Sequence, residues 1–268
     1  MAANAWRRWG ERVAEWMAGK GKSGGKEQEA REGHIHFVPV PTAAGETRTL
    51  KLRGGVKMEM VWCPPGTFTM GSPEDEEERA DSETQRQMTL TEGFWMAKYP
   101  VTQKQWKSVM GTQPSHFKGN SFPVEHVSWW ECLEFCKKAG LGLPTKVQWE
   151  YACRAGGTET GVGPEKLKAM GWFSENGGWK MYPVGRKLPN AWGLCDMYGS
   201  VWEWCMDTGD WSDERIILGG SCGERAKYGR SELRSTADPD FKEDPFGAPI
   251  MLIGFRPIAR QDSSGCES

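Results

Sequence analysis

The stretch PNAWGLCDMYGSVWEWCMD, residues 189–207, carries the strongest indication of the fold. Its middle part, DMYGSVWE (196–203), reads as a turn that leads into a strand. Because the side chains of a strand point alternately to its two faces, Val201, Trp202 and Trp204 straddle this strand, and one indole can enter the core. We therefore expect a short strand built around a buried tryptophan.

Two later blocks indicate that the same core continues toward the C-terminus. In LGGS (218–221), the paired glycines indicate a backbone conformation or a close approach that side chains would block. In IGFRPIAR (253–260), Phe255 lies between apolar neighbours, as expected of a closing central strand. Arg256 in such a place is expected to satisfy carbonyl groups or a buried carboxylate.

Three helices are predicted upstream of these blocks. Thr102, followed three residues later by glutamine, has the form of a capping box and predicts a helix over 102–110. Ser128 with glutamate at the third helical position predicts a second helix over 128–139, which ends at a glycine. A shorter helix is predicted over 145–154.

Short strands and loops account for most of the remaining chain. Segments 57–63 (KMEMVWC) and 94–99 (FWMAKY) have the composition of strands, and the acidic stretch 71–87 between them is predicted to be a surface loop. Beyond residue 155 the sequence carries little helix signal. Together these features predict an α+β fold with a large share of irregular loop.

The chain divides into four parts. Residues 1–20 place Trp and other apolar residues at helical spacing and predict an amphipathic helix; 21–33 is a Gly- and charge-rich linker. The main domain is assigned to 34–262 and a short tail to 263–268. The amphipathic helix is interpreted as docking on the domain or on a partner, with a membrane-surface anchor as the alternative.

The composition excludes several classes of protein. Fifteen Trp among 268 residues suit a loop-rich fold with a core of indoles, and 34 Gly with 16 Pro favour many turns. A formal charge of −2 provides no basic field for nucleic acid, and no tract is apolar for long enough to span a bilayer. We therefore expect neither a nucleic-acid partner nor a membrane span.

The eight cysteines show no CxxC motif and no Cys/His spacing typical of zinc. The N-terminus has no apolar segment of the kind found in a signal peptide. We therefore expect a cytoplasmic protein whose cysteines are mostly reduced and several of them buried.

In their order, eight blocks of the sequence resemble the formylglycine-generating-enzyme or sulfatase-modifying-factor family. The blocks are FTMGS (68–72), EGFWMAKYPVTQKQW (92–106), PVEHVSWWECLEFC (123–136), LPTKVQWEYACRAG (143–156), 189–207, LGGS (218–221), RSELR (230–234) and IGFRPIAR (253–260). The resemblance covers roughly 57–260. It implies a C-type-lectin-like fold of short antiparallel strands, two main helices and much irregular loop.

The resemblance also implies where an oxidase of this family would hold copper. Its two cysteines would follow the Ser221 position, where this sequence has Glu224 and Gly229. A carboxylate is a hard ligand and glycine offers none, whereas copper(I) selects thiolates. Cys222 is the nearest thiol. We therefore expect no copper and a non-catalytic member, with an oxidoreductase of altered active site, one using Cys222, as the alternative.

A second branch of the superfamily uses iron held by histidines. The four histidines here are His34, His36, His116 and His126, and the sequence shows no set of two histidines and one carboxylate. His126 occupies a common family position and is interpreted as structural.

The resemblance also implies a site for a structural calcium ion. The motif DMYGSVWE matches a family calcium site, with Asp196, Gly199 and Val201 contributing backbone or carboxylate oxygen and Glu203 its side chain. Calcium prefers six to eight hard oxygen ligands, which a turn with carbonyls and a carboxylate can supply. The alternative is a turn held by hydrogen bonds alone.

The segment 222–252 is the candidate recognition surface. Polar, charged and aromatic residues alternate there on a turn-rich segment, as in adaptable binding loops on a rigid scaffold. The chain also resembles variable proteins of diversity-generating retroelements, which bind ligands in this C-terminal segment. The predicted ligand-binding residues are Cys222, Glu224, Arg225, Lys227, Tyr228, Glu232, Leu233, Thr236, Asp238, Asp240, Phe241 and Phe246.

The leading hypothesis is therefore a non-catalytic domain that binds a protein or a small molecule through these loops and the neighbouring loop 171–182. A solvated loop without function is the alternative for 222–252. An adaptor that is recruited through the N-terminal helix is a third hypothesis.

Overall fold

The computed structural model describes residues 41, 43–74, 76, 79, 83–157, 162–209, 213–242 and 252–261. The predicted amphipathic helix, linker and C-terminal tail lie outside these residues, so these three predictions stay open. Of the part that is described, no helix is long and apolar enough to cross a membrane.

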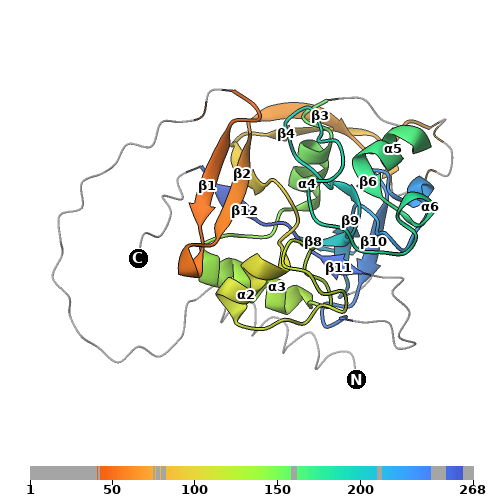
Figure 1. The fold of residues 1–268 in the computed structure, drawn as a ribbon. Helices are drawn as coiled ribbons and strands as arrows, with labels where there is room; N and C mark the ends of the chain where they lie inside the picture. Colours follow the sequence, from red (N-terminus) through yellow and green to blue (C-terminus); the bar gives the residue numbers. More distant parts are fainter. Residues whose placement is uncertain are drawn as a thin grey trace, which may run out of the picture. The chain divides into compact units, whose positions relative to one another are not determined.

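The first sheet joins the two ends of the domain (Figure 1). Its strand order is β1-β2-β5-β12, and each neighbouring pair is antiparallel. The strands are β1 (Thr47–Lys51), β2 (Lys57–Cys63), β5 (Phe94–Ala97) and β12 (Ile258–Arg260), with the short 3-10 helix η1 (Arg53–Gly55) between the first two. The predicted strands over 57–63 and 94–99 are thus confirmed, the second in a shorter form.

The second sheet contains the tryptophan-rich strand. Its order is β10-β9-β8-β11, where β8 pairs antiparallel with β9 and parallel with β11. The strands are β8 (Trp202–Thr208), β9 (Arg215–Leu218), β10 (Arg234–Ala237) and β11 (Ile253–Gly254). Trp202 and Trp204 both enter the same core cluster. From the sequence, one buried indole was expected on this strand.

The block 253–260 was predicted to be one closing central strand, and this prediction is wrong. It forms two short edge strands, β11 and β12, which belong to different sheets and flank residues 255–257. Pro257 has no N–H to donate to a ladder, and the Arg256 side chain is turned inward to main-chain carbonyls. The break therefore places a buried arginine between the two sheets.

The three predicted helices are confirmed within one residue at each end. They are α2 (Gln103–Met110), α3 (Trp129–Ala139) and α4 (Lys146–Cys153). Thr102 and Ser128 form the expected capping boxes, and Thr145 forms a third. Each cap satisfies an N-terminal N–H that the helix itself leaves without a partner.

Two further helices lie in the region where little helix was expected. They are α5 (Pro164–Met170) and α6 (Ser174–Gly177), and between them β6 (Gly171–Trp172) pairs in parallel with β7 (Tyr198–Gly199). Proline at the first position of α5, followed by glutamate, is a start signal for a helix. This signal was present in the sequence.

The acidic stretch 71–87, predicted to be a surface loop, connects β3 (Gly66–Met70) to β4 (Arg86–Leu90) and includes the first two residues of β4. Its Ser72 and Glu83 are buried, against that prediction, because they bond to each other and Glu83 pairs with Arg230. The buried apolar side chains of the described residues form two main clusters. Among the described residues, the indoles of Trp62, Trp106, Trp149 and Trp204 are fully buried. This explains how a chain with few long helices still forms a core.

Candidate functional site

The turn after β9 sets the path of the predicted recognition segment. Gly219 and Gly220 have positive φ values of 98° and 75°. A Cβ on Gly219 would lie 3.1 Å from the carbonyl oxygen of Met197, and one on Gly220 would lie 3.2 Å from the Cα of Gly229. The turn therefore needs both glycines, and it brings the chain at 220 against the chain at 229.

Gly229 is the position where the family resemblance implies a copper-binding cysteine, and this position has no space for a side chain. A Cβ there would lie 2.4 Å from the ring of Phe173. Phe173 is fully buried, so its ring is held by the surrounding core. The missing thiol is therefore accompanied by a filled volume, and a single substitution would not restore it.

Glu224, at the other implied cysteine position, is a mostly buried carboxyl group. Burial raises its pKa from the ordinary 4.5 to about 7, although the amide of Ser221 and the side chain of Trp202 oppose this shift. The Ser221 amide donates to Glu224 Oε2 at 3.3 Å. The Trp202 indole nitrogen is buried and lacks a well-formed hydrogen bond. A carboxyl group that changes charge near neutral pH thus lies beside a buried indole.

Cys222 does not have the environment of a nucleophile or a metal ligand. It is buried, and it clusters with Met181, Val201 and Leu252. Burial raises the pKa of its thiol to about 12, and the nearby carboxylates add to this effect. Because the thiolate is the reactive and metal-binding form, this environment disfavours Cys222 as a nucleophile or a metal ligand.

The other described cysteines are also buried, and none is bridged in the part of the chain that the structure describes. Burial raises the pKa of the thiols of Cys132, Cys136 and Cys205 in the same way. The prediction of reduced, buried cysteines is consistent with this arrangement.

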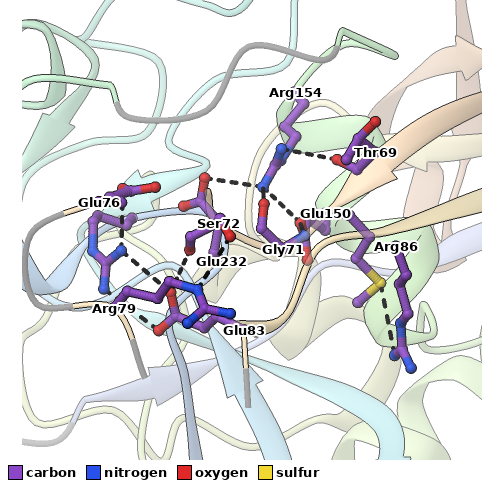
Figure 2. A network of polar contacts seen from close by, with 12 residues as sticks. Thr69, Gly71, Ser72, Glu76, Arg79, Glu83, Arg86, Glu150, Arg154 and Glu232 are labelled. Carbon is purple, nitrogen blue, oxygen red and sulfur yellow. Dashed lines mark hydrogen bonds and ion pairs between the residues drawn. The ribbon is translucent and has the colours of Figure 1, made fainter. Parts of the chain in front are cut away.

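Glu232 was predicted to contact a ligand, and the structure places it inside the protein instead. Its carboxylate accepts from Arg154 Nη2 at 2.9 Å, and the same nitrogen lies 2.8 Å from Glu150 (Figure 2). Arg154 also donates to the carbonyl oxygens of Thr69 and Gly71. Removing one member would leave a buried charge without its partner, so Glu232 supports the fold rather than a ligand.

Arg230 extends this polar network to the acidic loop. Its guanidinium lies 3.1 Å from Glu76 and 3.2 Å from Glu83, and Glu83 in turn accepts from the hydroxyl of Ser72. Figure 2 shows Glu76 and Glu83 in the same network of polar contacts as Arg154 and Glu232. The loop between β3 and β4 is thereby fastened to residues 230–232.

Several other predicted ligand-binding residues also serve the fold. Thr236, in β10, donates to Glu214, and Leu233 and Phe241 are partly buried against the main core cluster. Asp238 is exposed, and its carboxylate accepts from the amide of Asp240. Phe246 lies outside the described residues.

Arg225 and Tyr228 are exposed and Lys227 is half-buried, so the accessible predicted residues form two groups, these three and the exposed Asp238 and Asp240. The 3-10 helix η3 (Ala226–Tyr228) contains Lys227 and Tyr228. Arg225 lies 3.7 Å from Glu175 of α6, and the Lys227 ammonium lies 4.8 Å from the centre of the Tyr228 ring. The first accessible group therefore lies next to α6.

The predicted calcium ligands do not all fit an ion. Both carboxylate oxygens of Glu203 accept from Arg256, and one also accepts from the Trp149 indole at 2.6 Å. The Glu203 carboxylate is thus satisfied by protein donors, and we correct the ligand set by removing it. No cluster of three or more His, Cys, Asp and Glu side chains suited to a metal occurs among the described residues.

Asp196 fits a cation better. It is buried with a φ of 53°, and its Oδ2 accepts from the Gly185 amide at 2.6 Å. Its Oδ1 is buried without a hydrogen-bond partner, and burial raises the pKa of the carboxyl group to about 6. Gly199, at the β6–β7 pair, and the buried Val201 follow within five residues. An orphaned buried oxygen is where an ion or a water would be expected.

The structure also brings together residues that the sequence did not connect. His116 and His126 have ring centres 6.0 Å apart, and the buried Glu125 contacts His126 while accepting from the amides of His116 and Phe117. His126 has a φ of 59°. These contacts support a structural role for His126.

Nothing in the sequence marked Arg154 or Phe173 as important for the site, because only the fold shows what they contact.

Comparison with known proteins agrees with this architecture. The model of the "Sulfatase-modifying factor enzyme 1-like domain" family matches residues 50–258. The chain is 28% identical over 221 residues to the formylglycine-generating enzyme of Mus musculus, covering 57% of this chain and 58% of that protein. It is 30% identical over 195 residues to the inactive C-alpha-formylglycine-generating enzyme 2 of Bos taurus, covering 64% and 62% respectively. The chain thus spans about three fifths of these relatives.

Among solved structures, Treponema denticola variable protein 1 superposes with a TM-score of 0.70 at 24% identity, covering 80% of this chain and 99% of that one. At this identity the similarity shows the fold alone, which is the predicted α+β, C-type-lectin-like one. The family match, which extends over most of the domain, shows more: this chain belongs to the sulfatase-modifying factor enzyme 1-like family.

Proposed function

We propose that this domain binds a protein or small-molecule ligand through loops 171–182 and 222–241 and does not catalyse copper-dependent oxidation. The observation that carries the proposal is the filled volume at Gly229, where Phe173 occupies the space that a second thiol would need. Glu224 replaces the first thiol with a carboxyl group. A pair of thiolates for copper(I) therefore has no place at this turn.

The two kinds of relative support this proposal from different sides. One curated relative is named as an inactive formylglycine-generating enzyme, which indicates that the family includes members without the oxidase activity. A solved structure with the same fold is named as a variable protein. A scaffold of this type is therefore compatible with recognition as its main function.

Burial supports a smaller set of ligand-contacting residues than the sequence predicted. Cys222 and Glu232 are buried inside the domain, whereas Arg225, Tyr228, Asp238 and Asp240 are exposed. A fixed backbone with exposed polar and aromatic side chains is typical of binding loops. A retroelement-diversified variable protein is the finer form of the proposal, which a near-repeat of the 3′ coding segment beside a reverse transcriptase gene would support.

The test combines metal analysis with ligand selection on the full chain. Protein reconstituted with copper(I) should retain no stoichiometric copper and consume no oxygen with a thiol substrate. The wild-type chain should select peptides from a displayed random library, and the Y228A variant should bind them more weakly. One equivalent of tightly bound copper with thiolate-dependent oxygen uptake would overturn the proposal.

An enzyme with altered chemistry is the second candidate, and Glu224 is the observation that favours it. A carboxyl group whose pKa is raised to about 7 suits general acid–base catalysis near neutral pH. Under this alternative E224Q abolishes turnover, and C222S does so only if the thiol reacts. A binding domain would tolerate both changes.

We also propose a structural calcium ion held by the Asp196 carboxylate and the carbonyl groups of Gly199 and Val201. The unpartnered Oδ1 of Asp196 supports this assignment. Such an ion would supply charge neutralisation to a loop-rich region with few ladder hydrogen bonds. Glu203 has no part in it, because its carboxylate is bonded to Arg256.

A further inference from the structure

The large exposed apolar side chains of the described residues belong to two segments, the loop after α6 and η3. The large hydrophobic residues exposed there are Trp179 at 50%, Leu188 at 62% and Tyr228 at 40%. Trp179 and Leu188 lie in the loop after α6, and Tyr228 ends η3. A scattered single residue needs no explanation, but such a concentration indicates a contact surface.

Hydrogen bonds hold the segments of this region together. The Ser174 amide, in α6, donates to the carbonyl oxygen of Glu224 at 2.8 Å, and the Ala226 amide, in η3, donates to Glu175 at 2.7 Å. The Leu188 amide donates to the carbonyl oxygen of Ala169 in α5 at 3.1 Å. Figure 1 shows α5 and α6 on the same side of the domain. We call the surface formed by residues 162–188, which include α5 and α6, and residues 224–229, which include η3, the α5–η3 face.

The α5–η3 face is basic, although the chain as a whole is not. Segments 162–188 and 224–229 contain seven Lys and Arg and three Glu, whereas the chain has a formal charge of −2. Lys187 lies 4.0 Å from the centre of the Trp172 ring and donates to the carbonyl oxygen of Lys168 at 2.6 Å, whereas Arg225 is two thirds exposed and lies 3.7 Å from Glu175. The face therefore presents an excess of positive charge.

The backbone at Trp179 points to the same region. Trp179 has a φ of 61°, in the left-handed region that bulky residues rarely adopt, and half of its side chain is exposed. A left-handed bulky residue costs free energy, and exposed indole does not return it through burial. An energetically unfavourable residue of this kind is often retained where it contacts a ligand.

We infer that the α5–η3 face binds an acidic segment of a partner protein, in which carboxylates alternate with apolar anchors. This inference rests on the proposed binding function and specifies its ligand. Trp, Tyr and Arg are the residues enriched at the energetic centres of protein interfaces, and charge complementarity orients the partner. The exposed indole, leucine and phenol would receive the apolar anchors, and the surrounding Lys and Arg would pair with the carboxylates.

A polypeptide fits this face better than a lipid or nucleic acid surface. The amides at the start of α6 and η3 are already bonded to Asn176 and Glu175, so they are not available for phosphate groups. The exposed Trp179, Leu188 and Tyr228 add apolar surface beside the cations. A partner protein can supply both carboxylates and apolar side chains to such a surface.

The experiment selects random displayed peptides on the immobilised full chain and then measures the affinity of the enriched peptides in solution. We expect acidic peptides with apolar residues, whose affinity falls about tenfold or more in R225E/K227E and when their Glu and Asp are replaced by Gln and Asn. The matched control is K51E/K57E, which reverses two exposed lysines that face each other across β1 and β2. This control should bind like the wild type.

The remaining outcomes separate this inference from the function beneath it. Enriched peptides that depend on Tyr228 but carry no acidic bias would overturn the acidic partner and leave the binding function intact. The absence of any peptide that depends on Tyr228 or Arg225 would overturn the acidic partner and, with it, the protein-binding form of the proposed function. Binding of phosphatidylserine vesicles or of duplex DNA, lost in R225E/K227E and stronger than that of the peptides, would also overturn the acidic-protein partner.

Discussion

The guanidinium of Arg256 and the carboxylate of Glu203 form a fully buried ion pair, with Nη2 2.8 Å from Oε1. Arg256 also donates to the carbonyl oxygens of Ala97, Lys98 and Cys195, so one side chain joins the first sheet, the turn before β7 and the central strand of the second sheet. It lies in the break between β11 and β12. The two sheets are thus held by a cation that the chain itself provides.

Removing this cation should strongly destabilise the domain. We expect R256A to lower the free energy of unfolding by about 3–5 kcal/mol, because Glu203 would remain buried without its partner. R256K should recover only part of the loss, since an ammonium cannot reproduce the planar donor set. Urea denaturation measures both, with K51A as a surface control. A loss in R256A of less than about 1 kcal/mol would show that the pair is not essential.

Glu224 should make stability depend on pH. Because the fold raises its pKa above the ordinary value, its neutral form is favoured; this contribution is complete below pH 4.5 and is lost as the pH rises through about 7. E224Q keeps the neutral form, so its stability relative to the wild type should increase by about 1–2 kcal/mol between pH 5 and pH 8. Urea midpoints across this range provide the measurement. A difference that stays constant with pH would contradict the raised pKa.

Cys222 should be unreactive in the folded protein. With the pKa of the thiol raised to about 12, only about one molecule in ten thousand carries the thiolate at pH 8. A thiol reagent should therefore label Cys222 only as fast as the protein opens, while the guanidinium-unfolded chain should react at once. Mass spectrometry of timed samples locates the label. Rapid native labelling of Cys222 would favour the enzyme with altered chemistry.

Calcium should stabilise the wild-type domain through Asp196. We expect added calcium to raise the midpoint of thermal unfolding and a chelator to lower it, with D196A losing most of this response and E203Q retaining it despite its lower stability. The orphaned Oδ1 of Asp196 and the occupied oxygens of Glu203 give the physical reason. Equal midpoints with calcium and with chelator would favour the turn held by hydrogen bonds alone.

Local signals in the sequence were sufficient for much of the fold. Thr102 and Ser128 placed two helices to within one residue, because a capping box satisfies backbone groups that no tertiary contact needs to supply. The break at Arg256 was not predictable in this way. An apolar run with a central arginine fits one strand or two, and only the carbonyls that surround the guanidinium distinguish them.

The candidate site depended even more on contacts between distant residues. Arg225, Lys227 and Glu232 look alike in sequence as polar residues of one loop, yet Glu232 is buried on Arg154 and Arg225 is exposed beside Glu175. Burial of a charge is set by its partner, which lies 78 residues away for Glu232. The residue pattern within the segment therefore could not distinguish its buried charged residues from its exposed ones.

The volume at Gly229 provides the last prediction, because it can be tested by restoring the two thiols. E224C/G229C should bind no copper(I) stoichiometrically and should be less stable by about 1–3 kcal/mol, since the new Cβ meets the ring of Phe173. Adding F173A should remove the extra cost of G229C, although F173A alone lowers stability by creating a cavity. Urea denaturation of the wild type, G229C, F173A and F173A/G229C gives the coupling between positions 173 and 229. If E224C/G229C bound copper(I) with Phe173 in place and lost no stability, the ring would not exclude the thiol, and replacement of the two cysteines alone would account for the lost site.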